Sequence, residues 1–151
     1  MLVHKEDYSE QRGFTLIEIM VVVIILGLLA GLVLPRVLGR EEEARINAAR
    51  TQIRALESAL DSFKLDNGFY PTTDQGLEAL IKKPEIGRIP NKWREGGYLK
   101  PARIPKDPWG HDYIYISPGN EGREYEIISY GPDGEPGGEG KDADIESWKL
   151  E

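Results

Sequence analysis

An uncharged apolar run near the start of the chain constrains the fold more than any other feature. Sixteen consecutive residues from Ile19 to Leu34 carry no charge, and the apolar stretch reaches twenty-one residues when it is extended back to Phe14. As a helix, that stretch is about 31 Å long, which is close to the hydrocarbon thickness of a bilayer. We therefore predict a membrane-spanning and assembly helix over residues 14–35.

Two other interpretations compete with a plain membrane anchor. A secretory signal peptide has a shorter apolar core and a cleavage site of small residues, whereas Pro35-Arg36-Val37 follows the run here. An anchor that also packs against copies of itself would explain Glu18, because a carboxylate in an apolar span is costly without a cationic partner. Glu18 could instead lie at the headgroup level and complement its own helix N-terminus. Both explanations of Glu18 stay open.

Charge and residue types exclude several functions. The net charge of −7 argues against a nucleic-acid-binding surface. The chain has no cysteine, which excludes disulfides, cysteine-ligated metals and thiol nucleophiles. His111-Asp112 with Ser117 is a triad-like set, but it has no nucleophile elbow and no glycine-rich oxyanion signature. We therefore expect that the protein is not an enzyme.

Beyond Pro35 the sequence predicts an amphipathic continuation of the helix over residues 36–66. Its apolar residues recur every three or four positions, at Ile46, Ala49, Ile53, Leu56, Leu60 and Phe63. Asn67-Gly68 is a typical helix stop. The apolar stripe is short for a coiled-coil dimer, which favours packing on the chain's own globular region. Pro35 itself removes one helix hydrogen bond, which predicts a kink or local melting there.

Residues 67–151 predict a globular region that is rich in turns. The sequence indicates a short helix within 74–83, strands over 113–116 and 124–130 joined by a hairpin loop, and a last strand or extended tail over 144–149. A long N-terminal α-helix packed on a small antiparallel β-sheet belongs to the α+β class.

The end of the chain is acidic and rich in glycine. Seven acidic residues stand against two lysines from Tyr130 onward, and five glycines lie between residues 131 and 140. A solvated acidic tail is one interpretation of this composition. The other is a loop held by a hard cation, which takes six to eight oxygen ligands and so suits carboxylates and free carbonyls.

The N-terminal pattern resembles a known export signal. Gly13-Phe14-Thr15-Leu16-Ile17-Glu18 ahead of the apolar run is similar to the class III signal of type IV pilins and of the pseudopilins of type II secretion. This resemblance implies that a prepilin peptidase removes residues 1–13 as a leader, cutting between Gly13 and Phe14, and methylates the new amine of Phe14. It also implies that Glu18 pairs with the Phe14 amine of a neighbouring subunit during assembly.

Motifs through the rest of the chain resemble the major pseudopilins in particular. They include Tyr70-Pro71-Thr72-Thr73, Asp107-Pro108-Trp109-Gly110 and Tyr130-Gly131-Pro132-Asp133-Gly134. The resemblance implies a Ca²⁺ site in the C-terminal loop. Its ligands would be the side chains of Asp133, Asp142 and Asp144, with backbone oxygens of Tyr130 and of Gly140 or a neighbour.

The family also implies a function and a location. We expect a structural subunit that polymerises into a periplasmic pseudopilus and drives the export of folded proteins. It would be a single-pass inner-membrane protein, with residues 67–151 in the periplasm. Its expected partners are copies of itself, the prepilin peptidase, minor pseudopilins, the inner-membrane assembly platform and, before assembly, membrane lipid. The alternatives are a type IV pilin or a minor pseudopilin and, more distantly, a membrane-tethered calcium-dependent enzyme.

Overall fold

The computed structural model describes residues 13–150, except for the side chains of residues 33–38. The chain divides into two compact units, Met1–Arg40 and Glu41–Glu151. The predicted leader therefore lies outside the described residues, apart from Gly13.

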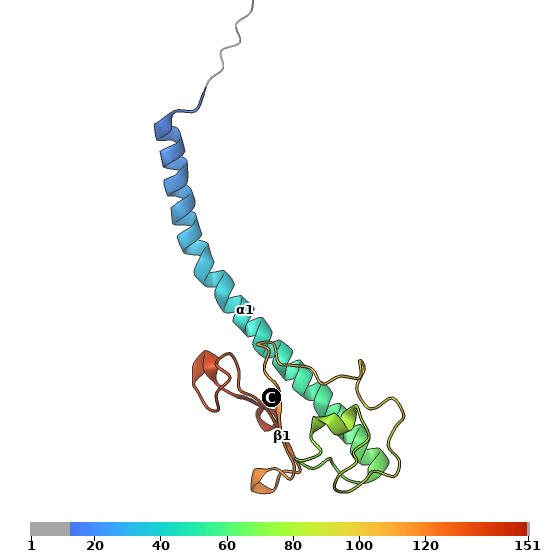
Figure 1. Ribbon diagram of the computed structural model, residues 1–151. Coiled ribbons are helices and arrows are strands. Elements are labelled where there is room, and N and C mark those ends of the chain that lie inside the picture. Colours follow the sequence, from blue (N-terminus) through green and yellow to red (C-terminus); the bar gives the residue numbers. More distant parts are fainter. Residues whose placement is uncertain (1–12, 151) are drawn as a thin grey trace, which may run out of the picture. The chain divides into compact units, whose positions relative to one another are not determined.

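A single long helix, α1 (Leu16–Asn67), begins in the first unit and ends in the second (Figure 1). Thr15 and Glu18 cap its start reciprocally. The Glu18 N–H donates to Thr15 Oγ1 (3.2 Å), and the Thr15 N–H donates to Glu18 Oε2 (3.4 Å). Gly68 ends the helix with a φ of 81° and donates its N–H to the Lys64 carbonyl. α1 includes Pro35, so the backbone of this structure stays helical where the sequence predicted a kink or local melting. Melting of this segment in a filament stays open.

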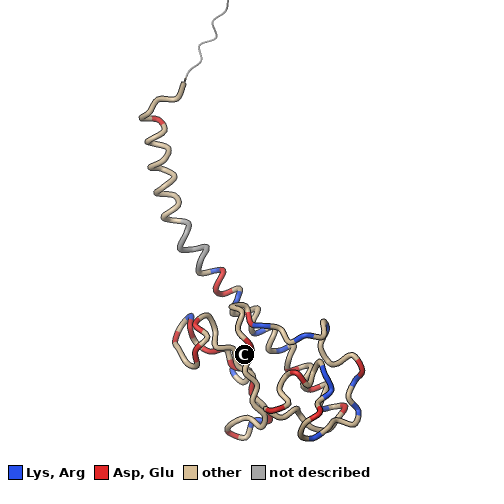
Figure 2. Tube along the Cα trace, viewed as in Figure 1, with Lys and Arg blue, Asp and Glu red and all other residues tan. Residues whose placement is uncertain are grey.

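The first unit presents apolar side chains on all sides of α1. Every residue from Gly13 to Leu32 is exposed, and Leu32 is 72% exposed. Glu18 is the one charged residue between Gly13 and Leu32, and this part of the chain is almost entirely tan in Figure 2. Within the described residues, no helix combines the length and apolar character needed to cross a membrane. The anchor predicted over 14–35 includes residues 33–35, whose side chains are not described.

The second unit contains a three-stranded antiparallel sheet in the order β1-β2-β3. Its strands are β1 (Ile114–Ile116), β2 (Glu126–Ser129) and β3 (Ile145–Glu146). Ile114 pairs with Ile128, and Ser129 pairs with Ile145. Short 3-10 helices complete the unit: η1 (Leu77–Leu80), η2 (Asn120–Gly122), η3 (Gly140–Asp142) and η4 (Ser147–Lys149). The predicted α+β class is confirmed, and the predicted last strand is shorter than expected because η4 follows it directly.

The core of the second unit lies between α1 and the sheet. The predicted apolar stripe of α1 is fully buried at Ala49, Ile53, Leu56, Leu60 and Phe63. These side chains share one cluster with residues of η1 and all three strands, including Leu80, Tyr115, Ile127 and Ile145. The helix therefore packs on its own globular region, as its apolar spacing predicts.

Candidate functional site

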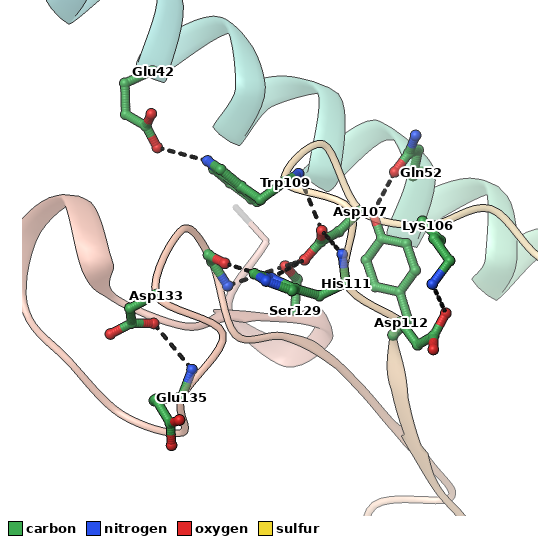
Figure 3. A network of polar contacts seen from close by, with 12 residues as sticks. Glu42, Gln52, Lys106, Asp107, Trp109, His111, Asp112, Ser129, Asp133 and Glu135 are labelled. Carbon is green, nitrogen blue, oxygen red and sulfur yellow. Dashed lines mark hydrogen bonds and ion pairs between the residues drawn. The ribbon is translucent and has the colours of Figure 1, made fainter.

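The turn over residues 107–111 is built around one buried carboxylate. The side chain of Asp107 is fully buried. Its Oδ1 accepts the N–H groups of Trp109 (3.1 Å) and His111 (2.8 Å), as Figure 3 shows. The Asp107 N–H also donates to the His111 carbonyl, which closes the turn on itself. These contacts fix the directions in which Trp109 and His111 leave the turn.

The other oxygen of Asp107 joins this turn to the end of β2. Ser129 Oγ donates to Asp107 Oδ2 over 2.7 Å, and Ser129 is fully buried. The Gly131 N–H in turn donates to Ser129 Oγ (3.3 Å). The carboxylate of Asp107 thereby ties the turn to the point where the C-terminal loop begins.

Trp109 and His111 reach two different parts of the second unit. The Trp109 indole N–H donates to Glu42 Oε1 on α1 (3.1 Å), and His111 Nδ1 lies 3.1 Å from the Gly131 carbonyl oxygen (Figure 3). A carbonyl can only accept, so the His111 Nδ1 carries the hydrogen. The His111 ring also covers Gly134, where an added Cβ would lie 3.0 Å from ring atoms.

Tyr113 follows this turn and is buried. Burial, and to a smaller degree the charge of Asp107, raises the pKa of Tyr113 above its usual range. The hydroxyl therefore stays protonated and donates to the side chain of Gln52 on α1. This contact is a second polar link between the turn region and the helix.

The C-terminal loop over residues 130–144 carries the predicted metal ligands. Asp144 Oδ2 accepts the Gly137 N–H (2.8 Å), whereas Asp144 Oδ1 is buried and has no hydrogen-bond partner in the described part of the chain. Asp133 Oδ1 accepts the Glu135 N–H (3.2 Å). Gly138 has a φ of 89° and lies so close to the Asp142 carbonyl that a Cβ would come within 2.3 Å of its oxygen. Figure 2 shows that acidic residues dominate this loop.

The predicted ligands share this loop but do not form a preformed cluster. No three histidine or carboxylate side chains gather into a possible metal site within residues 13–150 as described.

The triad-like residues found in the sequence do not form a catalytic set. Asp112 is exposed and pairs with Lys106, while Ser117 Oγ donates to the Glu124 carbonyl. The buried Ser129 donates to Asp107 rather than to His111. A nucleophile bonded to a general base is therefore not formed by these groups.

The N-terminal site residues lie at the start of α1. Phe14 is 79% exposed, and Gly13 is exposed beside it. Glu18 takes part in the capping pair with Thr15, which corresponds to the interpretation that it complements its own helix N-terminus. The pairing of Glu18 with a second subunit stays a prediction.

Sequence reasoning identified the loop residues but missed the Asp107 network. Asp107-Pro108-Trp109-Gly110 was recognisable as a turn, and a buried aspartate in such a turn commonly binds nearby backbone N–H groups. Its contacts to Ser129 and, through Trp109, to Glu42 join positions far apart in the sequence. No local pattern predicts such contacts.

Comparison with known proteins identifies the family. The model for "Type II secretion system (T2SS), protein G" matches residues 36–148, and the model for the prokaryotic N-terminal methylation motif matches residues 8–34. The chain belongs to the type II secretion system protein G family. The resemblance that the sequence motifs indicated is thereby confirmed.

Individual relatives agree along nearly the whole chain. Type II secretion system core protein G of Vibrio cholerae is 56% identical over 142 residues, covering 94% of both chains, and its Pseudomonas aeruginosa counterpart is 52% identical, covering 92% of this chain and 96% of that protein. The crystal structure of the major pseudopilin from the type 2 secretion system of enterohaemorrhagic Escherichia coli aligns with a TM-score of 0.64 and 42% identity, covering 74% of this chain and 92% of that one.

Proposed function

We propose that this protein polymerises into the periplasmic pseudopilus that drives the export of folded proteins through a type II secretion system. The observation that carries the proposal is the contrast within α1. From Ala49 to Phe63 its apolar stripe is buried in the second unit, whereas from Gly13 to Leu32 every residue is exposed. A helix that is apolar on all sides must be covered by lipid or by other helices. Copies of the same helix would supply that cover in a filament.

The same contrast supports a passage from membrane to filament. We propose that the anchor over residues 14–35 first lies in the inner membrane, with residues 67–151 in the periplasm. The prepilin peptidase would cut between Gly13 and Phe14 and methylate the Phe14 amine, which the match to the N-terminal methylation motif supports. The assembly platform and minor pseudopilins would then act on the processed subunit. Pairing of the Phe14 amine with Glu18 of a neighbour would offset the cost of burying both charges.

We further propose that the C-terminal loop binds one Ca²⁺. Carboxylates of Asp133, Asp142 and Asp144 would hold the ion with backbone oxygens of Tyr130 and of Gly140 or a neighbour. The oxygen-only donor set suits a hard cation. The buried, unpartnered Oδ1 of Asp144 supports the fit, because a buried carboxylate oxygen without a partner is costly and a cation would satisfy it. The bound ion would remove repulsion between the carboxylates and order a glycine-rich loop.

A deletion and complementation experiment tests the main proposal. The gene for this chain is deleted from its source bacterium and restored on a plasmid, and exported proteins in the medium are measured. Overproduced subunits are examined for filaments by electron microscopy. We expect restored secretion and filaments that contain the chain. Normal secretion in the deletion strain, with loss of surface pili instead, would favour the type IV pilin alternative.

Minor pseudopilins are distinguished by stoichiometry. If the chain is the main subunit, quantitative mass spectrometry of purified filaments will find it in large excess over every other pseudopilin. Its presence in only trace amounts beside another pilin-like subunit would favour the minor pseudopilin alternative.

A further inference from the structure

The turn over residues 107–111 contacts two parts of the second unit that lie far apart in the sequence. Trp109 reaches Glu42 on α1, and His111 reaches Gly131 at the start of the C-terminal loop (Figure 3). Both contacts leave a turn whose backbone is held by the single carboxylate of Asp107. A displacement of one contact must therefore strain the other.

We propose that this turn couples calcium occupancy of the 130–144 loop to the attachment of α1 at Glu42. The inference rests on the proposed calcium binding and adds a consequence for the helix. Calcium binding to the loop would hold His111 against Gly131. The hydrogen bonds of Asp107 to the N–H groups of His111 and Trp109 would then hold Trp109 in place. The Trp109 indole would in turn hold the segment of α1 around Glu42.

The first link joins His111 to the backbone beside two proposed ligands. Gly131, whose carbonyl accepts from His111 Nδ1, follows Tyr130, and Gly134, which the His111 ring covers, follows Asp133. An ordered loop therefore places the Gly131 carbonyl and Gly134 against the His111 ring at the same time. An empty loop, with its carboxylates repelling one another, can move away and leave the Nδ1–H without its acceptor.

The second link is the buried carboxylate of Asp107. It accepts three hydrogen bonds, from the N–H groups of Trp109 and His111 and from the hydroxyl of Ser129. A buried charge that loses part of its hydrogen bonding is strongly destabilised, so these partners are held or released together. The turn thus behaves as one body between the loop and the helix.

The third link holds a part of α1 that has little other burial. None of the residues from Glu41 to Ala48 is fully buried, and Ala49 is the first that is. The hydrogen bond from the Trp109 indole to the Glu42 carboxylate is charge-assisted and so stronger than a neutral one. Segments with few buried contacts open most readily in the native state, so loss of this bond should be visible there.

The test is hydrogen–deuterium exchange of the full chain in detergent micelles, with saturating calcium or with chelator, read by mass spectrometry over residues 41–48. In the wild type, calcium should slow exchange of these amides by about tenfold, the effect of one hydrogen bond to a charged group. Trp109→Phe removes the indole N–H, so the difference in exchange rate between calcium and chelator should fall to less than about twofold, which is below the effect of one hydrogen bond. Trp93→Phe is the matched control, because Trp93 donates its indole N–H to the Ala79 carbonyl, away from the turn. It should keep the wild-type response.

A second set of variants tests the same contacts without changing Trp109, so that misfolding of Trp109→Phe cannot account for the result. Glu42→Ala, at a half-buried position of α1, should also abolish the response, and Glu43→Ala, at the exposed neighbouring position, should preserve it. His111→Phe should abolish it, whereas His111→Asn should restore it because the amide can donate from near the Nδ1 position. Because coupling is reciprocal, Glu42→Ala should also weaken calcium binding, by no more than the same tenfold factor.

The possible outcomes distinguish a failure of the coupling from a failure of the proposed calcium binding. If calorimetry finds no calcium binding by the wild type, the proposed cofactor and the coupling both fail. If calcium binds but exchange over 41–48 does not respond, the coupling alone fails. It also fails if Trp109→Phe and Glu42→Ala keep the wild-type response, or if Trp93→Phe loses it equally.

Discussion

The hydroxyl of Ser129 donates to Oδ2 of Asp107 over 2.7 Å, and the two side chains are buried together where β2 ends. Oδ1 of the same carboxylate organises the turn that carries Trp109 and His111. One short contact between residues 22 positions apart therefore connects the sheet, the turn and the C-terminal loop.

Replacing Ser129 should destabilise the protein. Ser129→Ala leaves a buried carboxylate oxygen without its donor, which costs about 1–3 kcal/mol. Thermal melting of the full chain in detergent, followed by circular dichroism, measures the loss. Ser58→Ala is the control, because Ser58 only donates to its own helix at an exposed position, and it should change stability by less than about 0.5 kcal/mol. An equal loss of stability in Ser129→Ala and Ser58→Ala would contradict the conclusion that the Ser129–Asp107 hydrogen bond stabilises the fold.

Processing should remove the leader. Cleavage between Gly13 and Phe14 leaves 138 of the 151 printed residues, with a methylated N-terminal amine on Phe14. Intact-mass spectrometry of the membrane-extracted protein measures this change. Gly13→Leu should block cleavage, because the added side chain alters the residue beside the cut bond. Recovery of mature filaments that still contain Met1 would disprove the class III signal.

Glu18 variants should separate capping from charge. Glu18→Ala removes both the cap with Thr15 and the charge, and we expect normal membrane insertion with impaired polymerisation. Glu18→Gln is the sharper change, because glutamine can still accept from the Thr15 N–H but cannot pair with a cationic amine. Filament yield and secretion are measured for both. Wild-type filaments from Glu18→Gln would show that Glu18 acts only as a helix cap.

Calcium should stabilise the fold through the C-terminal loop. A ligand at a hundredfold excess over its Kd adds about 2.7 kcal/mol, so the wild type should melt at a higher temperature with calcium than with chelator. Asp144→Asn and Asp133→Ala should melt in calcium near the chelated wild type, and magnesium should substitute poorly because it demands a tighter octahedral shell. Glu139→Gln, an exposed acid in the same loop, is the control and should keep the calcium response. Identical wild-type curves with calcium and chelator would restore the interpretation as a solvated acidic tail.

Glu57 should make stability fall as pH rises. Burial, and then the charge of Asp61, raises the pKa of Glu57 above 4.5, while Arg54 opposes the shift. The folded state therefore binds this proton more tightly than the unfolded state, and its stabilising contribution is complete below pH 4.5 and lost as pH rises through the raised pKa. Glu57→Gln should be more stable than the wild type near neutral pH, by less than about 1 kcal/mol because the group is partly exposed and screened.

The matched control for this change is Glu78→Gln, at an exposed position of η1. It should give the same stability as the wild type across the pH range. Melting temperatures measured between about pH 4 and pH 8 test the prediction, since they span the window from the unfolded pKa upward. A Glu57→Gln variant that is destabilised near neutral pH would show that the carboxylate is held by a favourable contact instead.

Local patterns were sufficient to predict most elements of the fold. The three-and-four spacing from Ile46 to Phe63 predicted the buried face of α1, and Asn67-Gly68 predicted its end within one residue. The alternating strands and the family motifs were likewise visible, because each depends on neighbours within a few positions. The structure confirmed the antiparallel sheet and shortened its last strand.

The sequence by itself determined the apolar segment from Phe14 to Leu34, the amphipathic stripe and the acidic glycine-rich loop, since periodicity and composition are properties of the chain. Only the tertiary structure decided that Asp107 is buried against Ser129, that Trp109 reaches Glu42, and that one oxygen of Asp144 is buried without a partner. The contact between Trp109 and Glu42 spans 67 positions. Such contacts depend on how the packed elements bring distant backbones together, and no short stretch of sequence contains that information.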